Sequence, residues 1–183
     1  GLTDIEQMFD LLEVEAEVVD SPAAKPLVIA QGAIAFKDVH FHYDPERPIL
    51  KGVSFEVPAG KTVAVVGPSG SGKSTLIKSM LGYNKLDSGN IAVCGLDPVK
   101  QPLEIRRKVG YVSDVPGLYE WMTVAQAGWY ASGFYPQGFL KTYGERISDF
   151  QLPHDAKIRD LSKGMRAKVA LSLAMAFDPE LLI

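Results

Sequence analysis

Alternating hydrophobic and polar positions predict strands in the first part of the chain. Apolar side chains recur at alternate positions in residues 34–43, and a second alternating run at 53–57 follows the turn signal Asp44-Pro45. Residues 62–66 (Thr-Val-Ala-Val-Val) are rich in β-branched side chains, which is typical of a short strand covered on both faces. The apolar run 109–113 predicts a further short strand.

The later part of the chain has mostly helical spacing of its apolar residues. This pattern covers residues 119–172, and residues 163–177 form the clearest single helix, after which Leu181-Leu182-Ile183 begins another strand. Strands that flank a long helical insert indicate an α/β fold with a helical subdomain.

Three segments are predicted along the chain. Residues 1–17 are expected to form a leader helix, because the apolar positions within 3–15 fall on one helical face. Residues 18–32 contain two prolines and no helical pattern, which indicates a linker. Residues 33–183 then form one globular unit, whose helical insert covers about 119–172.

Composition narrows the function classes without identifying one. The 183 residues are 46% hydrophobic and 22% charged, with a formal net charge of −3, so there is no electrostatic case for nucleic-acid binding. The run Arg106-Arg107-Lys108 predicts a solvated face rather than a nucleic-acid patch. A single cysteine, Cys94, excludes an internal disulfide and fits a reducing compartment.

One stretch carries specific chemistry. It fits the pattern G-x-x-x-x-G-K-[ST], and it stands between a predicted strand and a predicted helix. Its residues are Gly67, Pro68, Ser69, Gly70, Ser71, Gly72, Lys73 and Ser74, followed by Thr75. A Gly/Ser-rich turn with a lysine by chance is the alternative interpretation, which the strand–loop–helix context disfavours.

The chemistry of this loop predicts a phosphate cradle. Glycines let the backbone wrap closely around phosphates with N–H groups pointing inward, and the helix N-terminus adds about half a positive charge. Lys73 is expected to reach the β- and γ-phosphates, Ser74 to ligate Mg²⁺ and Thr75 to contact the α-phosphate. ATP and Mg²⁺ are therefore the predicted cofactors.

Three further features resemble the nucleotide-binding domain of ABC (ATP-binding cassette) transporters, and the resemblance covers nearly the whole chain. Leu161-Ser162-Lys163-Gly164-Met165 resembles the family's L-S-G-G-Q signature at the start of a helix. Tyr43, at the end of a strand, is similar to the aromatic residue that stacks on adenine. The final run, residues 177–183, is similar to the approach to the Walker B strand.

The resemblance implies a fold, partners and a location. The fold is α/β: a P-loop NTPase core with an N-terminal antiparallel β subdomain, a helical signature subdomain and a sheet incomplete at the C-terminus. The partners are a transmembrane permease and a second ATP-binding domain, arranged head to tail so that each ATP lies between one P-loop and the other copy's signature. The location is the cytoplasmic face of a membrane, with the bacterial inner membrane as the specific expectation.

This sequence departs from the family pattern at three positions. Lys163 replaces a signature glycine, and Met165 replaces the signature glutamine. Asp114 stands where the family has the Q-loop glutamine. A carboxylate can ligate Mg²⁺, so Asp114 is a candidate metal ligand, with an ordinary solvated loop acid as the alternative. The aromatic residues of the insert are expected to pack, and by resemblance some contact the permease: Trp121, Trp129, Phe134 and Tyr135.

Two halves of the chain resemble different relatives. The part before about Leu76 resembles exporters of the heavy-metal and iron–sulfur type, whose membrane and ATPase domains share one chain. The later part resembles stand-alone ATPase subunits. A natural mosaic, a constructed chimera and a sequence assembled from two sources all explain this difference.

The resemblance also predicts what the chain can do. In the family the strand that begins near Leu181 continues to the Walker B Asp, the general-base Glu and the switch His, all expected beyond Ile183. The chain is therefore expected to be a truncated ABC ATPase that binds ATP but hydrolyses it negligibly. The alternatives are a non-transport ABC ATPase acting on DNA or ribosomes, and a constructed nucleotide-binding module.

Overall fold

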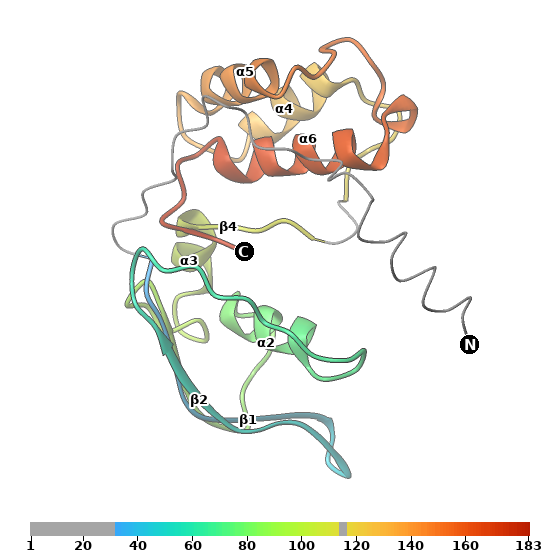
Figure 1. The fold of residues 1–183 in the computed structure, drawn as a ribbon. Coiled ribbons are helices and arrows are strands. Elements are labelled where there is room, and N and C mark those ends of the chain that lie inside the picture. Colours follow the sequence, from blue (N-terminus) through green and yellow to red (C-terminus); the bar gives the residue numbers. More distant parts are fainter. Residues whose placement is uncertain (1–31, 114–116) are drawn as a thin grey trace, which may run out of the picture.

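A computed structural model describes residues 32–113 and 117–183, which form three layers (Figure 1). An antiparallel sheet with helix α2 (Lys73–Met80) against it forms one end of the molecule. The other end is formed by α4 (Val124–Ser132), α5 (Phe139–Asp149) and α6 (Lys163–Met175), and between the two lie α3 (Pro102–Lys108) and β4 (Val109–Gly110). The predicted leader helix and nearly all of the predicted linker lie outside the described residues.

The sheet contains β1 (Ile34–Asp44), β2 (Arg47–Val57) and β3 (Ser88–Val93), in the order β2-β1-β3 and antiparallel throughout. It confirms the predicted N-terminal β subdomain. Inward-facing residues of β1 do not alternate strictly, because Phe36 and Val39 are both buried although they are three positions apart. The change of parity coincides with a register shift between these two residues, where Asp38 has a φ of 48°.

The first hydrophobic core lies between this sheet and two helices, α2 (Lys73–Met80) and α3 (Pro102–Lys108). Leu76 and Met80 of α2 and Ile105 of α3 are buried in the same cluster as Phe36 and Val39. This packing fixes α2, and therefore the loop that precedes it, against the sheet.

The strand predicted for residues 62–66 is wrong. The segment has no strand pairing in the described part of the chain, and Val63, Val65 and Val66 are 55%, 46% and 86% exposed. A strand exists only where a neighbour supplies ladder hydrogen bonds. Here the parallel pair β4 and β5 forms a separate two-stranded sheet, so β-branched composition alone does not produce a buried strand.

That parallel pair is short. β4 (Val109–Gly110) lies beside β5 (Leu181–Leu182), with Val109 opposite Leu181. The strand predicted at 109–113 is therefore shorter than expected, and the strand start predicted at Leu181 is confirmed. An ion pair between Lys108 and Glu180 reinforces the contact, and the Glu180 N–H donates to the Lys108 carbonyl at 2.7 Å.

The helical layer has its own core. It contains α4 (Val124–Ser132), α5 (Phe139–Asp149), the short 3₁₀ helix η1 (Ile158–Asp160) and α6 (Lys163–Met175), so the predicted 163–177 helix ends two residues early. Its buried side chains come from all four helices: Val124, Phe139, Tyr143, Ile147, Ile158 and Val169. No helix among the described residues is long and apolar enough to cross a membrane.

Candidate nucleotide site

The loop before α2 has the backbone shape of an anion cradle. Gly70 and Gly72 have φ values of 80° and 92°, in the left-handed region that favours glycine. Gly72 is the N-cap of α2, and a methyl group there would lie 3.2 Å from Cγ2 of Ile49 on β2. The two glycines therefore let the chain turn tightly against the sheet and enter the helix.

The first turn of α2 presents free donors. The N–H groups of Lys73, Ser74 and Thr75 have no acceptor within the described residues, whereas the Leu76 N–H already bonds the Gly72 carbonyl at 2.8 Å. The first turn also lacks an acidic side chain that would cancel the positive end of the helix dipole. These three amides fit a phosphate group.

Lys73 places its charge inside the loop. Its ammonium Nζ donates to the Gly67 carbonyl at 2.6 Å and to the Pro68 carbonyl at 2.9 Å. The side chain thus folds back over the loop instead of extending into solvent. Phosphate oxygens would compete for the same three N–H donors of the ammonium group.

Magnesium fits this site only together with phosphates. The described residues contain no group of three or more His, Cys, Asp or Glu side chains that could hold a metal. Ser74 is exposed in the first turn of α2, so its hydroxyl is available as one oxygen ligand. Mg²⁺ is commonly bound in this way, through one or two protein ligands plus substrate phosphates and water. Asp114, the other predicted metal ligand, lies outside the described residues.

Tyr43 has an exposed aromatic ring that a ligand can reach. It lies at the end of β1, is 62% exposed and packs edge-on against Phe41, with ring centroids 4.7 Å apart. The facing strand β2 carries Ile49, which contacts Gly72 of the loop. Tyr43 and the phosphate loop are therefore supported by the same hairpin, although its role in binding adenine stays a prediction.

The signature residues begin α6 as predicted. Ser162 is the N-cap, and its Oγ accepts a hydrogen bond from the Met165 N–H at 3.2 Å. Leu161 and Gly164 are buried, and Lys163 is exposed in a first turn without acidic residues. Because α2 and α6 belong to different layers (Figure 1), the loop and the signature do not form one site within this chain.

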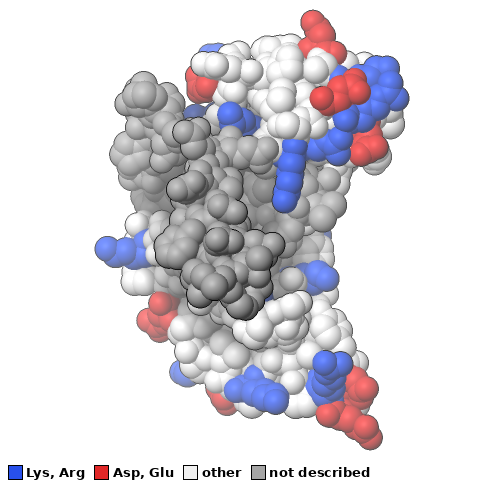
Figure 2. Space-filling model, turned by 45° about the vertical axis from the view of Figure 1, so that its right-hand side comes forward, with Lys and Arg blue, Asp and Glu red and all other residues white. Residues whose placement is uncertain are grey.

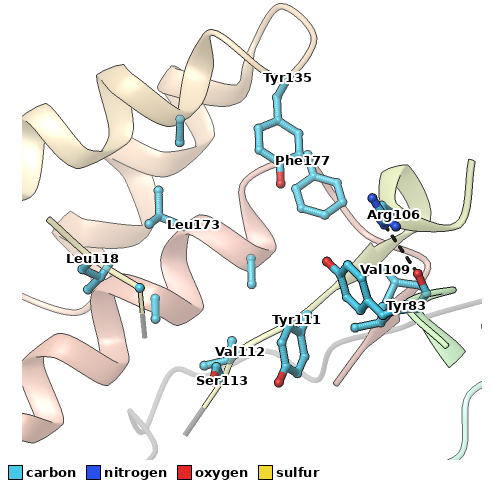
Figure 3. A pocket seen from close by; sticks show the side chains of 15 residues that line it. Tyr83, Arg106, Val109, Tyr111, Val112, Ser113, Leu118, Tyr135, Leu173 and Phe177 are labelled. Atoms are coloured by element: carbon cyan, nitrogen blue, oxygen red, sulfur yellow. Dashed lines mark hydrogen bonds between the residues drawn. The ribbon is translucent and has the colours of Figure 1, made fainter. Parts of the chain in front are cut away.

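A cavity of about 470 Å³ lies between the helical layer and β4 (Figure 3). Tyr135 and Phe177 stack on one side, with centroids 4.7 Å apart, and Arg106 lies 4.6 Å from the centre of the Tyr83 ring on another. Burial raises the pKa of Tyr135, with a smaller contribution from Tyr83. Ser113 lines the cavity as well.

The sequence pattern does not predict this cavity. Arg106 was expected on a solvated basic face, but its side chain is half-buried and donates from Nε to the Leu81 carbonyl at 3.4 Å. The available signal was its position directly after Ile105, the fully buried residue of α3. A side chain next to the buried stripe of a short helix often lies at the edge of the core.

The expectation that the insert's aromatic residues pack is also only partly met. Tyr135 packs, but Trp121, Trp129 and Phe134 are 63%, 68% and 73% exposed. Tyr119, Trp121, Tyr130 and Phe134 form a continuous series of ring contacts on the outside, with centroids 5.5–6.1 Å apart. An exposed aromatic surface of this kind is unusual in a monomer and indicates a contact surface. We call these four residues the aromatic surface.

Comparison with known proteins decides the family. The family model described as "ABC transporter" matches residues 50–183. The chain belongs to the ABC transporter family. Its fold is that of an ABC ATPase domain. The sequence is 33% identical over 195 residues to the human protein "Iron-sulfur clusters transporter ABCB7, mitochondrial". That alignment covers 100% of this chain and 26% of the human protein, so the chain spans about a quarter of its length.

Two solved structures support the same assignment. "Structure of a bacterial Atm1-family ABC exporter with ATP bound" superposes with a TM-score of 0.69 at 32% identity, over 99% of this chain and 33% of that one. "Structure of ATP binding subunit of ABC transporter" gives a TM-score of 0.71 at 28% identity, over 81% of this chain and 64% of that one. The chain thus resembles both an exporter and an ATP-binding subunit, and neither likeness is confined to one half of the sequence.

Proposed function

We propose that this ABC domain binds Mg-ATP on residues 67–75 and serves as the ATP-binding part of an exporter. The observation that carries the proposal is the phosphate loop itself: three free amides at the start of α2 face the same loop that holds the Lys73 ammonium. This arrangement combines a helix N-terminus, left-handed glycines and a cation, which together favour a polyphosphate.

Each residue has a distinct proposed role. The amides of Lys73, Ser74 and Thr75 hold phosphate oxygens, and the Lys73 ammonium exchanges the carbonyls of Gly67 and Pro68 for the β- and γ-phosphates. The Ser74 hydroxyl holds Mg²⁺, with Asp114 as a second proposed ligand. Bound Mg²⁺ would supply charge neutralisation on the phosphates. The Tyr43 ring stacks on the adenine.

The signature is proposed to act on ATP held by a second copy. Ser162 and the free end of α6 would face the γ-phosphate across a head-to-tail dimer, and buried Gly164 permits close approach of the backbone. The placement of α2 and α6 in separate layers supports this arrangement, because one copy does not bring its own loop and signature together. Lys163 adds a positive charge that the family's glycine lacks.

The partner that completes the exporter is proposed to be a membrane domain. The relative with 33% identity and the superposed exporter are both far longer than this chain, and their names describe transporters. We propose that the aromatic surface contacts that membrane domain on the cytoplasmic face of the membrane, which in a bacterium is the inner membrane.

Calorimetric titration with Mg-ATP tests the binding site. Lys73→Ala is expected to abolish measurable binding, since it removes the only side-chain cation in the described loop. Lys78→Ala is the matched control, because Lys78 is an exposed lysine in the last turn of the same helix. Equal affinities of wild type and Lys73→Ala would refute the assignment of the loop.

The rival function, an ABC ATPase acting on DNA or ribosomes, is less well supported. Acidic and basic side chains lie interspersed on the described part of the face in Figure 2, and the formal net charge is −3. Nucleic-acid binding by phosphate contacts requires clustered Lys and Arg and weakens steeply with salt. Salt-dependent retention on a DNA or RNA column would favour the rival.

A further inference from the structure

The side chain of Arg166 on α6 contacts two other segments, the turn that contains Arg159 and Leu161 and the loop that contains Glu120. Its Nε donates to the Leu161 carbonyl at 3.2 Å, and its Nη2 donates to the Arg159 carbonyl at 2.7 Å. Its Nη1 lies 3.3 Å from Oε1 of Glu120, as a hydrogen-bonded ion pair. One guanidinium near the start of α6 therefore contacts both η1 with its C-cap Leu161 and the loop that precedes α4.

These contacts satisfy carbonyls that have no other donor in the described chain. No backbone N–H of the described residues bonds the Arg159 or Leu161 carbonyl. The backbone N–H groups of η1 bond the loop before α4 instead. The Arg159 N–H donates to the Glu120 carbonyl at 3.1 Å, and the Ile158 N–H donates to the Met122 carbonyl at 2.9 Å. Arg166 thus completes the hydrogen bonding of the turn that leads into the signature.

We propose that Arg166 is the positioning residue of the signature. By holding the carbonyls of Arg159 and Leu161, it sets the peptide that precedes Ser162, and with it the direction of the Ser162 hydroxyl and the free end of α6. The effect on ATP rests on the proposed function, in which the signature meets the nucleotide of a second copy. The positioning itself depends only on the contacts in this chain.

The chemistry requires arginine. A guanidinium presents five N–H donors in a fixed plane, which lets it reach two carbonyls and a carboxylate at once. A lysine ammonium is a compact point charge and lacks that fork. Lys at this position should keep the attraction to Glu120 but lose at least one of the two carbonyls.

Amide hydrogen exchange on the full chain tests the positioning directly. The amides of Arg159, Asp160 and Leu161 donate to the carbonyls of Glu120, Lys157 and Ile158. In Arg166→Ala they should exchange about tenfold faster or more, because the turn that carries them loses its charged hydrogen bonds at the Arg159 and Leu161 carbonyls and opens more often. Arg166→Lys should give an intermediate increase in exchange rate, and Glu120→Gln a smaller one. Glu120→Gln also tests the proposal if the Arg166→Ala chain fails to fold. Lys168→Ala, which removes a cation from the same helix, is the control and should leave these amides unchanged.

A second measurement separates positioning from general stability. Affinity for Mg-ATP at the loop should stay within about twofold of wild type in Arg166→Ala, since that loop belongs to the other core. Association of two copies in the presence of Mg-ATP, followed by sedimentation, should weaken by about tenfold. A merely structural loss would not divide the two readouts in this way.

The outcomes distinguish the two proposals. Unchanged exchange at the three amides in a folded Arg166→Ala chain overturns the positioning role. Faster exchange combined with the absence of ATP-dependent association in the wild type supports the positioning role and overturns the head-to-tail part of the proposed function. Faster exchange together with weaker association supports both.

Discussion

Substitution of two helical glycines should change stability in opposite directions. Gly128 lies on α4 directly against Tyr143 of α5, and a methyl group at Gly128 would overlap the Cδ1 and Cε1 atoms of that ring. The ring cannot easily move, because Tyr143 is 1% exposed and its hydroxyl donates to the Val124 carbonyl at 2.7 Å. Gly144, on α5, has open space where a methyl group would be added.

The magnitude follows from three effects. Replacing glycine by alanine inside a helix stabilises by about 1 kcal/mol through helix propensity. At Gly128 this gain is opposed by overpacking, about 1–3 kcal/mol, and by disturbance of the Tyr143 hydrogen bond, about 1 kcal/mol. Gly128→Ala should therefore lower the free energy of unfolding by about 1–3 kcal/mol, whereas Gly144→Ala should raise it by about 0.5–1 kcal/mol.

Urea unfolding followed by far-UV circular dichroism measures both variants. Thermal unfolding should agree in sign, with a shift of about 2–4 °C for each kcal/mol in a chain of this size. A Gly128→Ala chain as stable as Gly144→Ala would mean that α4 and α5 do not pack as closely as described, and the reasoning about the helical core would fail.

Three other experiments follow from the site and its support. Tyr143→Phe should flatten the loss of stability at high pH: burial raises the pKa of Tyr143 above its ordinary 10.0, so its contribution is present below pH 10.0 and is lost as pH rises through the folded pKa. Equal pH profiles of both proteins above pH 10.0 would contradict this. Ser162→Ala should cost about 1 kcal/mol in urea unfolding, because the helix loses the Met165 N–H bond, while Ser162→Asn should cost less. Any phosphate that purified chain releases from Mg-ATP should disappear in Lys73→Ala, and equal release by both proteins would show that it does not come from this loop.

The hairpin and the phosphate loop could be predicted because their signals are local. Phe36, Val39 and Phe41 mark the inner face of β1 within one short segment, whereas the change of parity between Phe36 and Val39 comes from the register shift in the pairing with β2. The glycines of the loop are needed for φ values that any chain must meet at that turn, so spacing alone predicts the cradle. The same applies to the Ser162 cap, whose bond reaches only three residues.

The remaining features depend on partners far away in the sequence. Residues 62–66 have the composition of a buried strand, but a strand also needs neighbours, which composition does not reveal. Arg166 meets Glu120 only because η1 and the loop before α4 lie side by side. Trp129 directly follows the buried Gly128, but its own side chain is exposed. Its aromatic character predicted packing, and the sequence pattern does not show which face of α4 other helices cover.

The unpaired run 62–66 has a thermodynamic consequence for the loop that follows it. The phosphate loop continues on one side into a packed helix, but on the other side into five residues without a ladder partner in the described chain. Fixing the backbone of one residue costs about 1–2 kcal/mol of conformational entropy, so phosphate binding that orders this run loses part of its gross energy. A strand that paired with residues 62–66 would remove that cost and tighten ATP binding without touching a phosphate. By reciprocity, ATP would strengthen the pairing by the same factor.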